Sequence, residues 1–392
     1  MDPVLNPYAP GSGAAPPFLA GRDQLLESAS LAIERARRGN SGRGLLVTGL
    51  RGAGKTVLLQ RVSRDAESSG ALVIPIQCAA GRSLPALLAP KFRLGLLRLA
   101  RNDKSAANAR RALRALAGLA ESLHSKYPDI DVGLDCEAEP GVADSGDLEH
   151  DLLALLERSC DAVRAAESVL VLCIDELHAL AASEFVALVH SLHHCLQRQW
   201  PITLIGAGLP QLESTVEGNA DMAQLFELRS IGRLSPEDTR RAIGDPATAL
   251  RVQFEDAALH SMIAATQGFP YFLQELAKHA WDSAPRSPIT LQDTRKAAPL
   301  ALAALDEEFF RVGYARLTQA EKNYLRGMGG LGPGPHRSGD IAAALARPVS
   351  ALAPIRAQLI AKGMIWSPRH GDTCFAAPRF DEFLRRAESK NA

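Results

Sequence analysis

The sequence predicts an α/β protein with a parallel-sheet core, and two observations support this fold class. Short apolar segments recur between residues 24 and 208, and helical patterns separate them. Continuous apolar runs of this length are typical of parallel strands that are buried on both faces. The intervening helices then cover both sides of the sheet. The expected strands are Leu45–Thr48, Ala71–Gln77, Val169–Ile174 and Ile202–Gly206.

Length and composition set the class of protein. A chain of 392 residues allows two or three domains, at ~100–200 residues per domain. Lys plus Arg and Asp plus Glu balance at 44 each, so any surface that binds nucleic acid has to be local. No segment approaches the ~18–20 apolar residues of a membrane span, and the first residues lack the features of a signal peptide. Six scattered cysteines without a C-x-x-C pair favour a reduced, cytoplasmic setting.

The chain divides by composition into four parts. Residues 1–17 are a Pro- and Gly-rich arm, which we expect to be extended and only partly ordered. The α/β domain spans 18–234 and contains an insertion at about 80–150. A helical domain follows at 235–305, because its first residues combine an N-cap serine, a proline and an acidic first turn. A further domain occupies 306–392.

The insertion is basic in its first half and acidic in its second half. Two interpretations remain open. The first is a solvated helix followed by an acidic turn region. The second is a contact between the basic helix, which includes Arg110, Arg111 and Arg114, and DNA or another partner.

Residues 306–392 resemble a winged helix-turn-helix domain. A Thr-Gln-Ala-Glu capping box opens the first of three short helices, and Gly363 ends the third. The helices are expected at Thr318–Met328, Ser338–Leu345 and Ser350–Lys362, and a hairpin at Met364–Trp366 and Thr373–Ala376. Two kinds of partner stay open, double-stranded DNA and an unknown protein. The candidate DNA contacts are Arg347, Arg356, Gln358, Lys362, Arg369 and His370.

A phosphate-binding motif lies between the first expected strand and a helical segment. The segment Gly49–Thr56 fits G-x-x-x-x-G-K-[ST]. Glycines let backbone N–H groups turn toward phosphate, and the following helix adds its positive N-terminal end. Lys55 would neutralise the β- and γ-phosphates, and the Thr56 hydroxyl would bind Mg²⁺. The expected binding residues are Gly49, Gly52, Ala53, Gly54, Lys55, Thr56 and Val57.

An acidic pair follows the third expected strand. Asp175 and Glu176 come directly after the apolar segment that ends at Ile174. The carboxyl ends of parallel strands meet at one edge of a sheet, so the pair would lie beside the phosphate loop. Asp175 would hold the Mg²⁺ shell, and Glu176 would orient and activate an attacking water.

Two histidine positions nearby predict no special chemistry. We expect His178 to be an ordinary helix-surface or core residue. His193 and His194 are adjacent on a helical segment, so their side chains point in different directions and do not form a metal site.

The strands, the phosphate loop, the acidic pair and the following helical domain together resemble AAA+ ATPases, which are P-loop NTPases. The resemblance covers about residues 18–300 and is closest to bacterial ATPases near the origin-initiator and STAND-type signalling branches. It implies ATP or ADP as ligand, Mg²⁺ as cofactor and a helical lid domain over the nucleotide.

The resemblance also implies roles for residues outside the two motifs. Phe18–Asp23 is similar to an F-x-G-R-[DE] element whose arginine, here Arg22, touches the nucleotide. Pro270 is similar to a lid proline that approaches adenine. Gln77 would relay partner binding to Glu176. The alternative is that Gln77 is simply a polar residue at the end of a strand. The segment Gly206–Gly208 stands where many relatives carry a polar residue that touches the γ-phosphate, and its lack of one argues against fast hydrolysis.

Arg229 and Arg233 lie where an arginine finger is often found. A finger reaches the γ-phosphate of a neighbouring subunit, which would require self-association. A surface salt bridge is the alternative for either residue. The leading hypothesis is therefore an ATP hydrolase that couples turnover to a conformational change. The alternative is a slow or non-hydrolysing nucleotide switch for protein assembly.

Overall fold

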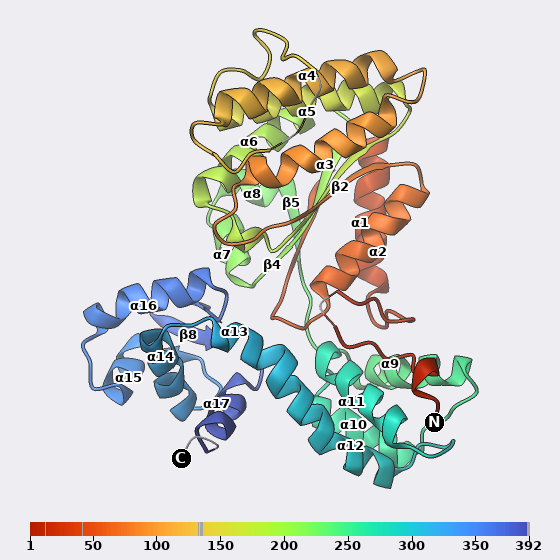
Figure 1. The fold of residues 1–392 in the computed structure, drawn as a ribbon, viewed down its shortest axis with the longest axis vertical. Coiled ribbons are helices and arrows are strands. Elements are labelled where there is room, and N and C mark those ends of the chain that lie inside the picture. Colours follow the sequence, from red (N-terminus) through yellow and green to blue (C-terminus); the bar gives the residue numbers. More distant parts are fainter. Residues whose placement is uncertain (12, 41, 132, 134–135, 390–392) are drawn as a thin grey trace.

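The computed structural model describes residues 1–11, 13–40, 42–131, 133 and 136–389 (Figure 1). Within them, parallel strands form one five-stranded sheet in the order β2–β3–β4–β1–β5. The strands are β1 (Gly44–Thr48), β2 (Leu72–Gln77), β3 (Leu170–Asp175), β4 (Ile202–Gly208) and β5 (Phe226–Ser230). The four expected strands and the α/β class are confirmed. The sequence does not predict β5, because charged residues interrupt its apolar pattern at this edge of the sheet.

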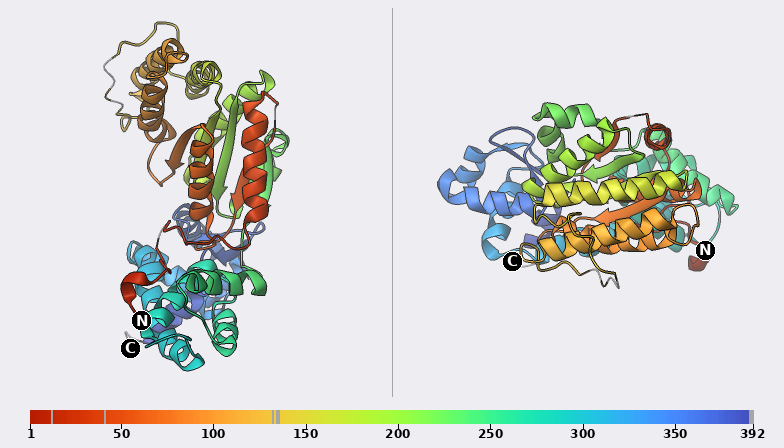
Figure 2. Two further views of the ribbon diagram at one scale, coloured as in Figure 1. Left: turned by 90° about the vertical axis from the view of Figure 1, so that its right-hand side faces the viewer. Right: turned by 90° about the horizontal axis from the view of Figure 1, so that it is seen from above.

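Helices cover both faces of the sheet, as the views of Figure 2 show. Alternate residues of a strand point to opposite faces. Leu46 therefore packs with α5 (Leu148–Ala165) and α6 (Ala182–Gln197), whereas Leu45 packs with α1 (Asp23–Arg37) and α2 (Lys55–Ser68). Short elements then connect β3 to α6 and β4 to β5. They are the 3₁₀ turn Leu177–Ala179, α7 (Gln211–Glu217) and α8 (Ala220–Leu225).

The insertion forms two amphipathic helices that thicken the α5/α6 layer. They are α3 (Leu84–Leu99) and α4 (Ala106–Leu123). Ala112, Leu116 and Leu119 of α4 are buried in the core, while Arg110, Arg111 and Arg114 are exposed. The expected solvated helix is thus solvated on one face only, and its other face is part of the hydrophobic core.

The lid domain is a group of four helices with its own core around Trp281 and Ile243. Its helices are α9 (Pro236–Ala249), α10 (Asp256–Thr266), α11 (Pro270–Ser283) and α12 (Leu291–Ala304). The Ser235 side chain accepts a hydrogen bond from the Asp238 N–H, which is the N-cap that the sequence predicts.

The N-terminal arm packs against the lid instead of standing free (Figure 1). Tyr8 is buried, and its hydroxyl donates to the Ile243 carbonyl. Trp281 Nε1 donates to the Asp2 carbonyl at 3.0 Å. One short 3₁₀ turn, Pro3–Leu5, precedes these contacts. Buried aromatic packing therefore holds the arm, which the expectation of a partly ordered segment did not include.

A continuous helical rod joins the lid to the C-terminal domain. It consists of α12, a π-helical segment (Leu305–Arg311) and α13 (Val312–Ala315). The predicted boundary between residues 305 and 306 falls inside this rod. Segments of π-helix are frequent at functional sites, and Phe309 in this one lines the cavity described below.

The C-terminal domain combines helices with a three-stranded antiparallel sheet in the order β6–β8–β7. Its elements are α14 (Gln319–Gly330), β6 (His336–Arg337), α15 (Ser338–Ala344), α16 (Val349–Ala361), β7 (Ile365–Trp366), β8 (Asp372–Phe375) and α17 (Phe380–Ser389). The three expected helices and the hairpin are present within two residues of their predicted bounds. In the described part of the chain, no helix is long and apolar enough to cross a membrane.

Candidate functional site

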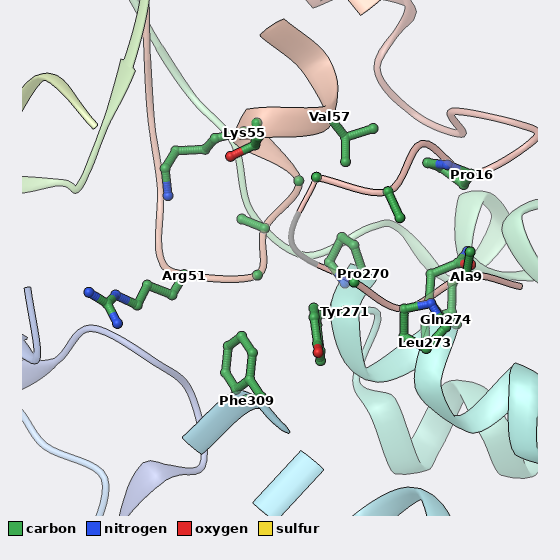
Figure 3. Close-up of a pocket in the computed structure, with 18 of the residues that line it drawn as sticks. Ala9, Pro16, Arg51, Lys55, Val57, Pro270, Tyr271, Leu273, Gln274 and Phe309 are labelled. Carbon is green, nitrogen blue, oxygen red and sulfur yellow. The ribbon is translucent and has the colours of Figure 1, made fainter. Parts of the chain in front are cut away.

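A cavity of about 420 Å³ lies where the sheet domain, the lid, the arm and the helical rod meet (Figure 3). The predicted site residues Arg22, Val57, Glu176 and Pro270 line it together with the 51–56 part of the phosphate loop. Figure 3 shows Lys55 and Arg51 on one side of the cavity and Pro270 on the other. The site expected at the carboxyl edge of the sheet is therefore a real hollow that four parts of the chain enclose.

The loop from β1 to α2 has a backbone that requires glycine. Gly52 and Gly54 have φ angles of 79° and 94°, in the left-handed region that other residues rarely adopt. A Cβ at Gly49 would lie 2.2 Å from the Ile231 carbonyl oxygen. The Gly49 N–H donates to the Gly208 carbonyl at 3.1 Å, which ties the loop to the end of β4. The N-terminus of α2 follows directly and directs its free N–H groups at the cavity.

Lys55 is buried, and its ammonium group is satisfied by the loop itself. Its Nζ donates to the carbonyls of Gly49 at 2.7 Å and Leu50 at 3.0 Å. Burial lowers the pKa of Lys55, while the nearby carboxylates of Glu176 and Asp175 raise it. The cation is thus held at the mouth of the loop, bound only to neutral acceptors that a phosphate can replace.

Thr56 and Asp175 are directly bonded. The Thr56 hydroxyl donates to Asp175 Oδ2 at 2.6 Å, and Asp175 Oδ1 accepts from the Glu176 N–H at 2.9 Å. Burial raises the pKa of Asp175, whereas the Thr56 hydrogen bond lowers it. One hydroxyl and one carboxylate are oxygen donors that suit Mg²⁺, which keeps several waters and binds phosphate oxygens as its other ligands. This donor pair fits the predicted metal role.

Glu176 stands at a sharp turn directly after β3. Its φ angle is 55°, an uncommon value for a residue other than glycine. The turn brings its half-buried carboxylate to the cavity wall, on the same side as Lys55. Strained positions of this kind cluster at functional sites, which supports the predicted catalytic position of Glu176.

His178 is buried beside Glu176 and is no surface residue. Its Nδ1 accepts a hydrogen bond from the Leu209 N–H at 3.2 Å, and its Nε2 lies 3.3 Å from Glu176 Oε2. Burial lowers the pKa of His178 to about 4, with Lys55 and Arg51 acting in the same direction. The sequence predicts a surface or core histidine, and no signal in it indicates this contact with Glu176.

Arg51 connects the phosphate loop to the C-terminal domain. Its backbone N–H donates to the Ala376 carbonyl at 2.9 Å, and its Nη2 donates to the Lys362 carbonyl at 3.1 Å. Burial lowers the pKa of Arg51, and Glu176 raises it. The sequence motif leaves this position unspecified, so motif matching does not identify Arg51 as a site residue.

Arg22 and Pro270 both reach the cavity, as the family resemblance implies. Arg22 is buried, and its Nη2 donates to the carbonyls of Gly232 at 2.6 Å and Ala53 at 3.4 Å. Burial lowers the pKa of Arg22, and Asp238 raises it. Pro270 begins α11. Arg22 therefore links the phosphate loop to the chain that leads into the lid.

The wall opposite Lys55 is built largely from residues that the motifs do not mark. The rings of Tyr271 and Phe309 pack at a centroid distance of 4.5 Å, and the Tyr271 N–H donates to the Gly52 carbonyl at 3.2 Å. Residues of the arm and of the segment after it complete the wall: Ala9, Pro10, Gly11, Gly13, Ala14, Pro16, Phe18, Leu19 and Ala20. The aromatic residue directly after Pro270 is the one available sequence signal. Nothing local indicates that Phe309 and the arm meet here.

Three predicted residues lie away from the cavity of their own chain. Arg229 is on the edge strand β5, where it forms an ion pair with Glu227 and is half exposed. Arg233 is exposed. Gln77 ends β2 opposite Asp175, and among the described residues no hydrogen bond joins it to Glu176. The relay of partner binding through Gln77 stays a prediction.

Comparison with known families divides the chain in two. Residues 19–205 match the AAA ATPase domain, and residues 307–384 match a domain of unknown function (DUF8462). No curated protein matches the chain.

The fold as a whole is similar to solved structures of low sequence identity. A Walker-type ATPase of Pyrococcus abyssi aligns over 94% of this chain and 96% of its own, with 12% identity and a TM-score of 0.56. Orc1 of Aeropyrum pernix in complex with DNA aligns over 96% and 94%, with 16% identity and a TM-score of 0.48. The RuvB Holliday junction branch migration motor of Thermotoga maritima aligns over 91% and 92%, with 18% identity and a TM-score of 0.43.

The fold and the family match agree on the part of the chain that contains the cavity. The parallel sheet, the glycine-dependent loop and the Thr56–Asp175 pair all lie in or directly beside the matched segment. Residues 19–205 of this chain therefore match an AAA ATPase domain, and they fold as a P-loop NTPase core.

Proposed function

We propose that this chain hydrolyses Mg-ATP and uses the nucleotide cycle to move its C-terminal domain. The observation that carries the proposal is the 2.6 Å hydrogen bond from Thr56 to Asp175, with Glu176 next to it at the wall of the same cavity. A hydroxyl and a carboxylate in direct contact form a ready pair of oxygen donors. Lys55 lies on the same side, bonded only to carbonyls.

In this proposal each residue has one task. Lys55 binds the β- and γ-phosphates, and the N–H groups of Gly52–Thr56 surround them. Thr56 and Asp175 hold Mg²⁺, which would neutralise phosphate charge when bound. Glu176 accepts a proton from the attacking water, since its carboxylate is the acidic side chain beside this loop that lines the cavity.

The contacts of the phosphate loop support coupling to the other domains. Arg51 is bonded to Ala376 and Lys362 of the C-terminal domain, and Gly52 is bonded to Tyr271 of the lid. A shift of the loop on phosphate binding would therefore alter hydrogen bonds to both domains. Domain movement of this kind is a common consequence of nucleotide binding.

Turnover and binding of ATP, measured together, test the proposal. The parent chain should hydrolyse ATP, and Glu176→Gln should bind ATP as tightly but lose roughly 100-fold or more of the rate, because an amide does not accept the proton. Glu67→Gln, an exposed change on α2, is the matched control. Equal turnover by Glu176→Gln and the parent would remove Glu176 from the catalytic role.

A second candidate function is a slow or non-hydrolysing switch for protein assembly. The favouring observation is the end of β4, where Gly206, Ala207 and Gly208 bring no polar side chain to the loop. A single-turnover measurement separates the two functions. A parent chain that binds ATP but retains it uncleaved for hours would support the switch.

We also propose that the C-terminal domain is a winged helix, which the order of its helices and strands supports. The partner of this domain is a separate proposal. Two predicted DNA contacts need correction. Arg356 donates to Thr373, Ser367 and the Asp372 carbonyl, which fastens α16 to the hairpin. Lys362 pairs with Glu321. Four exposed candidates remain for DNA, and only two of them are arginines, so a protein partner is the better supported one: Arg347, Gln358, Arg369 and His370.

Self-association is proposed only through Arg229 or Arg233 acting on a neighbouring subunit. Their exposure on the sheet domain leaves them accessible to a second copy. A rate per subunit that rises with protein concentration, and that Arg229→Ala abolishes, supports this role. A monomer with a constant specific rate argues against it.

A further inference from the structure

We propose that His178 is a positioning residue that holds the Glu176 carboxylate in place for water activation. The inference rests on the proposed hydrolytic function and adds a residue that neither motif contains. The two ring nitrogens of His178 face two different parts of the site: the end of β4 and the Glu176 side chain.

The hydrogen bond at Nδ1 fixes the tautomer of the ring. The Leu209 N–H donates to Nδ1 at 3.2 Å, so Nδ1 is the unprotonated nitrogen of a neutral imidazole. The proton then resides on Nε2, which lies 3.3 Å from Glu176 Oε2. The backbone of β4 therefore selects the ring form that presents an N–H to the catalytic carboxylate.

Packing holds the imidazole in this orientation. The side chain of His178 is only 5% exposed. A Cβ at Gly208 would lie 3.6 Å from Nδ1, and a Cβ at Gly363 would lie 3.5 Å from Nε2 and 3.0 Å from Arg51 Nη2. Both distances to the ring are ordinary van der Waals contacts, so the end of β4 and the residue after α16 border the ring on two sides. The ring touches the sheet domain and the C-terminal domain at once.

Lys55 and Arg51 also lie near Glu176, but Lys55 Nζ bonds to loop carbonyls and Arg51 Nη2 bonds to the Lys362 carbonyl, so neither is fixed on Glu176. Gln77 does not hydrogen-bond to it, and Gly206–Gly208 bring no polar side chain. Glu176 also has an unusual backbone angle, φ 55°, so its side chain depends on a local partner for direction. His178 is the partner that the structure provides.

The chemical consequence follows from the two carboxylate oxygens. At 3.3 Å the two groups are in contact without the alignment of a hydrogen bond, and a small rotation of the Glu176 side chain would bring Oε2 onto the Nε2–H. A donor at Oε2 would then engage this oxygen and leave Oε1 for the attacking water. In the reaction, the water oxygen bonds to the γ-phosphorus, the bond to the β–γ bridging oxygen breaks, and the water proton passes to Glu176. His178 neither gains nor loses a proton in this step.

A matched pair of substitutions tests the proposal in the full chain. The longer side chain of His178→Gln places an amide N–H near the position of Nε2. The shorter side chain of His178→Asn reaches only the position of Nδ1, where its amide oxygen can accept a hydrogen bond. We expect His178→Asn to lower kcat roughly 10- to 100-fold, with KM and the ATP Kd within about twofold of the parent, and His178→Gln to recover most of the loss. His190→Gln, in a remote pair with Glu149, is the control and should change nothing.

The outcomes separate this inference from the proposed function. A parent that hydrolyses ATP and a His178→Asn variant with equal or higher kcat would overturn the role of His178 while the hydrolase stands. A loss of ATP binding in His178→Asn would also overturn it, since the residue would then serve the fold of the site.

A second measurement does not depend on turnover. Nitrogen-15 NMR of the labelled histidine should show an unprotonated Nδ1 and a protonated Nε2, and the Nε2 signal should shift in Glu176→Ala. The opposite tautomer, or an Nε2 signal that does not change in Glu176→Ala, would refute the contact. This result would hold even if the chain does not hydrolyse ATP.

Discussion

The two sides of the nucleotide cavity are built in different ways. The Lys55 side consists of the phosphate loop and the ends of β3 and β4, which backbone hydrogen bonds hold together. The opposite side consists of the arm, the start of α11 and the π-helical part of the rod, which side-chain packing brings together from segments that are hundreds of residues apart. The first side should determine chemistry, and the second should determine affinity and domain coupling.

The largest effect is expected on the Lys55 side. Lys55→Ala should weaken ATP binding by roughly 100-fold, because charge-assisted hydrogen bonds to phosphate are lost. The melting temperature should change little, since Lys55 Nζ bonds only to carbonyls of its own loop. Isothermal titration with ATP measures the loss, and exposed Lys104→Ala is the control. Unchanged ATP affinity in Lys55→Ala would contradict the phosphate-loop assignment.

The opposite side should affect affinity without affecting the chemical step. Tyr8→Ala removes a buried ring that holds the arm on the lid. The arm would then cover the cavity only part of the time, so the apparent ATP Kd should rise about tenfold while kcat at saturation stays the same. Tyr8→Phe keeps the ring and should have a smaller effect. A fall in kcat instead of affinity would show that the comparison of the two sides is wrong.

The lid side should also make the stability of the fold depend on pH. Glu275 on α11 is fully buried, and His279 Nε2 lies 3.2 Å from its Oε1 without hydrogen-bond geometry. Burial raises the pKa of Glu275 from 4.5 to about 7. The folded chain therefore keeps the proton that the unfolded chain releases, and stability falls as pH rises from 4.5 to 7.

Glu275→Gln removes this titration. The variant should melt several degrees above the parent at pH 8, and the difference should shrink as pH falls toward 5. Thermal melts between pH 5 and pH 8 test whether the difference in melting temperature grows with pH, and the exposed change Glu67→Gln is the control. A difference that is constant with pH would mean that Glu275 does not titrate there.

The smallest effect is expected at the C-terminal domain. Any binding of duplex DNA by the full chain at low salt should be weak, because few basic side chains of this domain are exposed. The double change Arg347→Ala and Arg369→Ala should flatten the salt dependence by roughly one unit per lost phosphate contact. If the parent does not bind, or if both chains bind equally, the domain docks protein.

The same comparison explains what the sequence could predict. Lys55 and Thr56 were predictable from the glycine-rich motif between a strand and a helix. Asp175 and Glu176 were predictable because they follow a buried apolar strand, and parallel strands bring such ends together. The C-terminal helices were predictable from caps, such as the Thr318–Glu321 box, which the structure confirms.

Other parts depend on contacts between distant segments and leave no local pattern. Tyr8 was placed in a loosely ordered arm, because its Pro- and Gly-rich neighbours outweigh one aromatic ring. His178 was assigned to a surface or core position, because its partner Leu209 offers only a backbone N–H. Arg356 was assigned to DNA, because a basic residue on a candidate recognition helix gives no sign that the hairpin satisfies it.

Three consecutive residues of the phosphate loop are each bonded to a different part of the chain. Arg51 bonds to Ala376, Gly52 to Tyr271 and Ala53 to Arg22. Truncation of this protein will therefore not yield independent pieces. A fragment that ends before the C-terminal domain would leave the Arg51 amide open to solvent, where it should exchange its hydrogen faster than in the full chain. Rates measured on such a fragment would describe a loosened loop and not the full chain.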